Sequence, residues 1–135
     1  MNRSVDLMSN EKIGLTEAEW YLMECLWEKS PRTGRETVEY LSEHNGWSRS
    51  TTLTMLSRMT KKELISCDES GEMRTYSPLV ERNAAAMEET ESFLDRIYNG
   101  NLSLLVSAFT QKQNLSQKEI DELYSILKKA EEAKK

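Results

Sequence analysis

The sequence predicts a mainly α-helical protein with one small β-hairpin, and three observations support this fold class. Three segments begin with a hydroxyl residue followed three positions later by glutamate, the pattern of a helix N-terminal capping box. Apolar residues recur at helical spacing over most of the chain. The period changes within residues 65–77, where two short runs flank the turn signal Ser70-Gly71. With 135 residues, the chain is long enough for one or two small domains.

The first predicted helix begins after Thr16, which forms a capping box with Glu19, and runs to about Lys29. Residues 1–14 precede it, show no periodicity and are expected to form a flexible arm. The helix has a broad apolar arc and is the predicted centre of the core. This arc comprises Trp20, Leu22, Met23, Leu26 and Trp27.

Two further helices follow, joined by a short turn. Ser30-Pro31-Arg32 ends the first helix, and Thr33 with Glu36 forms the second capping box. The second helix is expected over about residues 34–43, and His44-Asn45-Gly46 makes the turn. Ser48 is a suitable N-cap for a third helix that reaches about Glu63. Two capped helices around a glycine-containing turn match a helix-turn-helix.

The third helix, within Trp47–Glu63, has two unlike faces. Its predicted inward stripe is Leu53, Leu56, Met59, Thr60 and Leu64. Its predicted outward face is Ser50, Thr51, Thr54, Arg58 and Lys61. The charged residues between Trp47 and Lys62 are all basic, namely Arg49, Arg58, Lys61 and Lys62, in a chain of net charge −5. Hydroxyls and cations suit contacts to phosphates and base edges, so we interpret it as a DNA-recognition helix; the alternative is an ordinary amphipathic surface helix.

A hairpin directly after such a helix is the "wing" of a winged helix-turn-helix domain, predicted here over residues 15–80. Its strands are expected at residues 65–69 and 73–77, and Pro78 ends the second. Arg74 has two readings of equal weight. It contacts a DNA phosphate near the minor groove, or it pairs across the hairpin with Asp68 or Glu69.

Residues 81–135 predict a second, helical domain. Helices are expected over residues 83–98, in a short apolar segment at 102–109, and after the third capping box of Ser116 and Glu119. So much apolar surface cannot be buried within about 50 residues, so these helices either fold back on the first domain or pair with a second chain. Pairing fits a DNA-binding protein, because two linked half-site readers gain affinity, and we predict a homodimer with its interface in residues 84–130. The predicted dimerisation residues are Phe93, Leu94, Ile97, Leu105, Phe109, Ile120, Leu123 and Leu127.

Several classes of function are not supported by the residues present. Cys25 and Cys67 are too few for a disulfide framework or a metal site, so two reduced thiols are expected. His44 is read as a surface turn residue, because nothing nominates a partner for catalysis. No nucleophile–base pair, metal cluster or glycine-rich phosphate loop is evident, so neither an enzyme nor a cofactor is predicted. The sequence has no signal-peptide pattern and no run long enough to span a membrane, so a cytoplasmic protein is expected.

The order of these elements and several short motifs resemble the BlaI/MecI/CopY family of bacterial repressors. The resemblance covers about residues 15–130. The motifs that carry it are residues 15–20 (LTEAEW), 26–28 (LWE), 47–48 (WS), 51–52 (TT), 56–59 (LSRM), 61–63 (KKE), 76–79 (YSPL) and 118–123 (KEIDEL). It implies a winged helix that binds a palindromic double-stranded operator as a dimer, with a C-terminal dimerisation domain. It also implies that Ser50, Thr51, Thr54 and Arg58 read the DNA, with Lys61 and Lys62 at the end of the helix.

The resemblance bears on regulation as well. Copper-responsive members have a cysteine-rich C-terminus, which this chain lacks. Other members are inactivated by proteolysis at an Asn–Phe bond, and the matching position is Ala108-Phe109. Phe is present and Asn is not, so this bond is either the target of a regulatory protease or Phe109 is simply a core residue, the reading we favour.

The expected function is therefore a sequence-specific transcriptional repressor that acts as a homodimer. The alternative is a winged-helix module that binds protein without binding DNA. The net charge of −5 favours this alternative, because many DNA-binding domains are basic.

Overall fold

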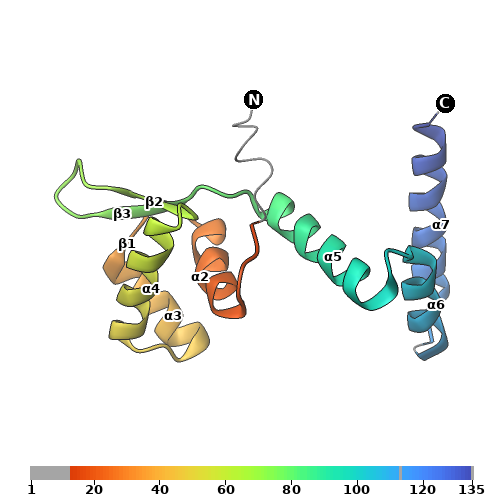
Figure 1. Cartoon of the computed structure of the whole chain (residues 1–135), viewed down its shortest axis with the longest axis horizontal. Helices are drawn as coiled ribbons and strands as arrows, with labels where there is room; N and C mark the ends of the chain where they lie inside the picture. The colour runs from red at the N-terminus through yellow and green to blue at the C-terminus, as the bar shows by residue number, and fades with distance from the viewer. Residues whose placement is uncertain (1–12, 113, 135) are drawn as a thin grey trace. The chain divides into compact units, whose positions relative to one another are not determined.

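The computed structural model describes residues 13–112 and 114–134 (Figure 1). The chain divides into two compact units, Met1–Thr90 and Glu91–Lys135. The predicted N-terminal arm lies outside the described residues except for Ile13 and Gly14. Ile13 packs against the core of the first unit.

Three helices make up most of the first unit: α2 (Glu17–Glu28), α3 (Gly34–Asn45) and α4 (Arg49–Lys61). Each begins where its N-cap residue predicts. Thr16 and Thr33 form complete capping boxes, in which the hydroxyl accepts from the amide three residues later and the glutamate there accepts in return. Ser48 caps α4 by accepting from the amide of Thr51. The helices of the predicted helix-turn-helix are thus confirmed.

A three-stranded antiparallel sheet lies beside these helices, with strand order β1-β3-β2 (Figure 1). Strands β2 (Ile65–Asp68) and β3 (Thr75–Pro78) form the predicted hairpin. Strand β1 (Arg32–Thr33) was not predicted from the sequence. It has only two residues, and Arg32 pairs with Tyr76, so the information that makes it a strand lies more than 40 residues away along the chain.

The hydrophobic core sits between α2, α3, α4 and β2. Helix α2 contributes the largest share of it, although its tryptophans are only half-buried. The fully buried large side chains include Leu22, Met23, Leu26, Leu41, Leu56, Met59 and Ile65.

The inward stripe predicted for α4 is partly wrong. Leu53 is 39% exposed, whereas Thr52 is fully buried and Met55 nearly so. The buried positions 52, 55, 56 and 59 form one helical stripe, so Leu53 lies beyond its edge. Leu53 was placed in the core because it is apolar. The rotation of α4 about its axis, which packing determines, instead brings Thr52 and Met55 to the core.

Helix α5 (Arg82–Tyr98) crosses from the first unit into the second, where α6 (Leu102–Lys112) and α7 (Gln117–Glu132) follow. Asn99 and Gly100 adopt positive φ values of 53° and 77° and end α5. Ser116 and Glu119 form the predicted third capping box. No residue of α6 or α7 is buried in the single chain. None of the helices in the described part of the chain is long and apolar enough to cross a membrane.

Candidate nucleic-acid interface

Helix α4 is held against the body of the first unit by a short turn. Gly46 adopts the left-handed conformation, with φ of 68°, and its amide donates to the carbonyl of Ser42 at the end of α3. The amide of Trp47 donates to the carbonyl of Leu41 over 3.2 Å, and Ser48 then caps α4. This turn orients α4 so that Thr52, Met55, Leu56 and Met59 face the core. The opposite side of the helix is left to solvent.

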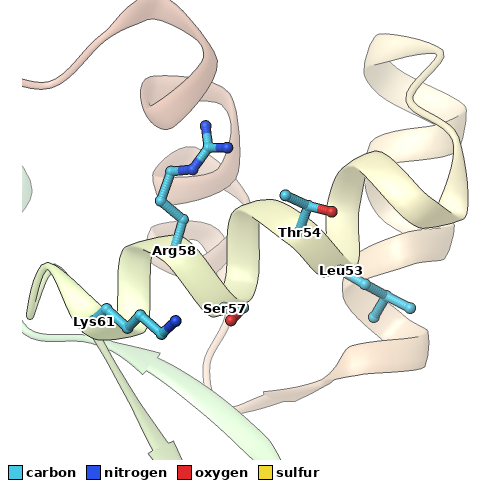
Figure 2. A pocket seen from close by; sticks show the side chains of 5 residues that line it. All are labelled: Leu53, Thr54, Ser57, Arg58 and Lys61. Carbon is cyan, nitrogen blue, oxygen red and sulfur yellow. The ribbon is translucent and has the colours of Figure 1, made fainter.

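The solvent side of α4 carries the residues predicted to read DNA. Ser50, Thr51, Thr54, Arg58 and Lys61 are all exposed, as is Arg49. Figure 2 shows Thr54 and Arg58 projecting from the same side of the helix on successive turns. Together with Leu53, Ser57 and Lys61 they line an open hollow of about 470 Å³.

Leu53 and Ser57 were missed as candidate interface residues. The signal for Ser57 was present, because it lies three residues after Thr54 and seven after Ser50 and therefore shares their face. Leu53 was assigned to the core because it is apolar. An exposed apolar side chain on such a helix can contact the methyl group of thymine.

The electrostatics of this face favour an anionic partner. No acidic side chain occurs in α4, and Arg58 and Lys61 occupy its last turn. Among the residues that the structure describes, no ion pair engages Arg49, Arg58 or Lys61. These three cations can therefore reach phosphate oxygens without first leaving a carboxylate.

Lys62, the fourth basic residue, is engaged inside the first unit. Its Nζ lies 2.6 Å from Oε2 of Glu19, whose side chain is only 3% exposed. Burial works to raise the pKa of Glu19, but the hydrogen bonds from Lys62 and Thr16 outweigh it and leave this pKa below its ordinary value. The same carboxylate thus completes the cap of α2 and ties it to the end of α4. A direct DNA contact by Lys62 stays a prediction, and any such contact competes with Glu19.

Arg74 lies on the wing and pairs with Glu69, as the second reading of the sequence proposed. Its Nε is 3.4 Å from Oε1 of Glu69, and both side chains are 66% exposed. Such an exposed pair is weak, so it does not prevent Arg74 from turning to a phosphate. Between α4 and the wing lies a second hollow of about 350 Å³, lined by Arg74, Lys61 and Tyr76 among others.

The two cysteines are free and differ in their surroundings. Cys25 is fully buried in α2, and burial raises the pKa of its thiol to about 11. Cys67 is half-buried on β2 and lines the hollow between α4 and the wing. His44 is exposed and stacks on Tyr40 with 3.9 Å between ring centroids. In the described part of the chain, no group of histidine, cysteine and carboxylate side chains could hold a metal ion.

The predicted dimerisation residues lie on α5, α6 and α7 with much of their surface in solvent. Leu94, Leu105 and Ile120 are half-buried. The others are exposed, with Phe93 at 39%, Leu123 at 42%, Ile97 at 53%, Phe109 at 54% and Leu127 at 62%. Ala108 and Phe109, the bond considered for cleavage, lie inside α6. The favoured reading of Phe109 as a core residue does not hold within one chain, because α6 has no buried position.

Comparison with known proteins gives a consistent result. The family model described as "Penicillinase repressor" matches residues 15–129. The methicillin resistance regulatory protein MecI of Staphylococcus aureus is 31% identical over 122 residues, which are 90% of this chain and 99% of that protein. The penicillinase repressor of Bacillus licheniformis is 34% identical over 121 residues, 90% of this chain and 94% of that protein. A solved structure of monomeric Bacillus licheniformis BlaI with the blaP half-operator is 27% identical, covers 55% of this chain and 90% of that chain, and has a TM-score of 0.49.

Proposed function

This chain belongs to the penicillinase repressor family, and from that premise we propose that it is a transcriptional repressor that binds a two-fold-symmetric operator as a homodimer. The observation that carries the proposal is the solvent face of α4. There Ser50, Thr51, Thr54 and Arg58 are exposed on a helix without acidic residues.

In this proposal α4 enters the major groove and its side chains divide the work. Arg58 has a planar guanidinium that can bind guanine through two hydrogen bonds. Ser50, Thr51 and Thr54 supply hydroxyls for base edges or phosphates. Arg49, Lys61 and Arg74 neutralise phosphates at the start of α4, at its end and on the wing, and Lys62 joins them only when it leaves Glu19. Because the chain as a whole is acidic, its non-specific binding to DNA should be weak, and the operator is selected mainly by the base contacts.

Dimerisation is supported by the apolar surface of the second unit. A large apolar side chain gains roughly 1.5–3 kcal/mol when it becomes fully buried. Phe93, Ile97, Phe109, Leu123 and Leu127 are 39–62% exposed in the single chain, so a substantial part of this gain is unused. A second copy supplies a matching surface by symmetry, and two linked readers bind a palindrome more tightly than one.

In this proposal the dimer represses transcription because, when bound across a promoter, it blocks RNA polymerase. Its site of action is then the promoter DNA in the cytoplasm. Release by a regulatory protease at Ala108-Phe109 would act on the dimer. Cleavage inside α6 would separate α7 from α5 and remove part of the apolar surface proposed for dimerisation. A peptide bond inside a helix must unfold locally before a protease can bind it.

The test of this function is selection of DNA by the purified protein from a random-sequence library at moderate salt. An enriched two-fold-symmetric site is expected, with an affinity that falls as salt rises. No enrichment by a folded dimer would instead indicate the protein-binding module, for which no salt-dependent DNA binding is expected.

Arg58→Ala tests the assignment of α4. We expect a loss of operator affinity of about 1–3 kcal/mol per subunit, the range for a good guanine contact, with dimerisation and helix content unchanged. Arg58→Lys is the matched variant that keeps the charge but loses the planar guanidinium. Its operator affinity should lie between those of wild type and Arg58→Ala. Operator affinity that is the same in wild type and Arg58→Ala would remove α4 from the proposed mechanism.

A further inference from the structure

The first turn of α5 is attached to α2 by contacts that lie away from the candidate DNA interface. Nε and Nη2 of Arg82 donate to the two carboxylate oxygens of Glu24 over 2.9 and 3.0 Å. The Arg82 guanidinium carbon also lies 5.9 Å from the centroid of the Trp27 ring. The indole Nε1 of Trp27 donates to the carbonyl of Val80 over 2.8 Å. We call this set of contacts among Glu24, Trp27, Val80 and Arg82 the α2–α5 latch.

Two further contacts hold the same part of α5. Ala85 is only 3% exposed, and the amide of Gly14 donates to Oε1 of Glu88 over 3.2 Å. Just three residues, 79–81, separate β3 from α5, and none of them is glycine or serine. A link this short, without flexible residues, does not act as a free tether. The first two turns of α5 therefore belong to the body of the first unit.

The latch is better suited to fix a direction than to stabilise the fold. The side chains of Arg82 and Glu24 are 53% and 42% exposed, and exposed ion pairs contribute little to stability. Their double hydrogen bond nevertheless fixes the plane of the guanidinium against the carboxylate. The hydrogen bonds from Arg82 also lower the pKa of Glu24, so this carboxylate stays ionised at neutral pH.

We propose that Glu24 and Arg82 are positioning residues that fix the start of α5 on the winged helix and so restrict the half-site spacing that the dimer reads. This inference rests on the proposed function, in which the two copies meet through their C-terminal helices. Two readers joined by a fixed connection gain affinity only when the spacing of their sites matches the connection. A looser connection allows the dimer to bind operators with more half-site spacings. At each spacing, however, the effective concentration of the second reader at its half-site is lower.

The test uses the full-length protein and three kinds of duplex built from the selected operator. These are a single half-site, the palindrome as selected, and palindromes whose half-sites are moved apart or together by single base pairs. For wild type we expect one strongly preferred spacing. For Arg82→Gln and Glu24→Gln we expect a flatter dependence, with affinity at the preferred spacing lowered about tenfold, within the gain that linking two sites provides. Affinity for the half-site should not change.

Three controls separate positioning from a general loss of charge or fold. Arg82→Lys keeps the charge without the double hydrogen bond and should behave like Arg82→Gln. Arg35→Gln removes a cation from another exposed pair, Arg35–Glu39, and should keep the wild-type spacing preference. The double variant Glu24→Arg, Arg82→Glu restores an ion pair and should recover part of that preference. Because Trp27 donates to Val80, its indole proton should exchange with water faster in Arg82→Gln, which reports the latch without any DNA.

The outcomes distinguish this inference from the proposed function. An Arg82→Gln protein that binds the half-site like wild type and keeps the same spacing preference overturns the inference alone. A wild-type protein that selects no site, or that stays monomeric, overturns the proposed function, and the inference fails with it.

Discussion

Helix α2 and helix α7 both begin with a complete capping box and both carry apolar residues at helical spacing, yet only α2 buries them. Leu22 and Leu26 of α2 are fully buried, whereas Leu123 and Leu127 of α7 are 42% and 62% exposed. The capping box fixes where a helix starts, and packing partners decide whether its apolar stripe is covered. The first unit has these partners within one chain. In the second unit α6 and α7 have no buried residue within one chain, which is why we propose that a second copy covers them.

The largest effect should follow from a cavity in the first unit. Leu26→Ala removes a fully buried side chain, so the unfolding free energy of the first unit should fall by about 2–5 kcal/mol. All three tryptophans of the chain, at positions 20, 27 and 47, lie in the first unit, so tryptophan fluorescence during urea denaturation reports this unit alone. A midpoint like that of wild type would mean that the core does not hold the first unit together.

A smaller effect of a different kind is expected in the second unit. Leu127 is 62% exposed in the single chain, so Leu127→Ser should weaken the dimer by roughly 1–2 kcal/mol per chain, that share of the value for fully burying a large apolar side chain. It should leave the tryptophan-detected midpoint unchanged. Sedimentation at several concentrations measures the dimer. Leu79→Ser is the matched control, because Leu79 is 58% exposed in the first unit, close to the 62% of Leu127. Equal sedimentation of the two variants would contradict the contrast between the units.

A gain of stability is expected at one flaw in the packed unit. Oγ1 of Thr52 is buried and finds no hydrogen-bond partner among the residues that the structure describes, so Thr52→Val should raise the unfolding free energy by about 1 kcal/mol. Thr37→Val is the comparison, because Thr37 is equally buried but its hydroxyl donates to the carbonyl of Thr33 over 2.9 Å. The second substitution should destabilise. Thermal unfolding of both variants checks the opposite signs, and a loss in both would mean that the hydroxyl of Thr52 is satisfied in solution.

The smallest effect concerns pH and Glu19. Its pKa in the folded protein lies below the ordinary value of 4.5, so the folded state favours the ionised form. The contribution of ionised Glu19 to the unfolding free energy is therefore complete above about pH 5. It is lost as pH falls through the lowered pKa of Glu19 in the folded protein. Urea denaturation of wild type and Glu19→Gln between pH 3 and 7 measures this difference. The difference in unfolding free energy between wild type and Glu19→Gln should become smaller towards low pH. A difference that does not change with pH would rule out ionisation of Glu19 as its source.

Local signals predicted the fold well, and contacts distant in sequence account for what was missed. The capping boxes at Thr16, Thr33 and Ser116 need only four residues each, so the helix starts could be read directly. Strand β1 depends on Tyr76, and no pattern within Arg32–Thr33 reveals that pairing.

The candidate site shows the same division between local and distant information. The exposure of Ser50, Thr54 and Arg58 follows from helical periodicity, whereas the phase error at Leu53 arose because packing rather than composition sets the buried stripe. Lys62 joins Glu19 across 43 positions, and the α2–α5 latch joins Glu24 to Arg82 across 58. Neither pair has a local signature, because each depends on how the helices pack.

The contrast between the two cysteines provides a spectroscopic handle on the wing. The thiolate is the nucleophile that attacks a maleimide, and Cys25 is fully buried with a thiol pKa of about 11, so in the folded protein a maleimide dye is directed to Cys67. Cys67 lines the hollow between α4 and the wing, beside Lys61 and Arg74. The natural sequence therefore accepts one fluorophore per chain, without mutation, at the place where an approaching duplex would change its emission.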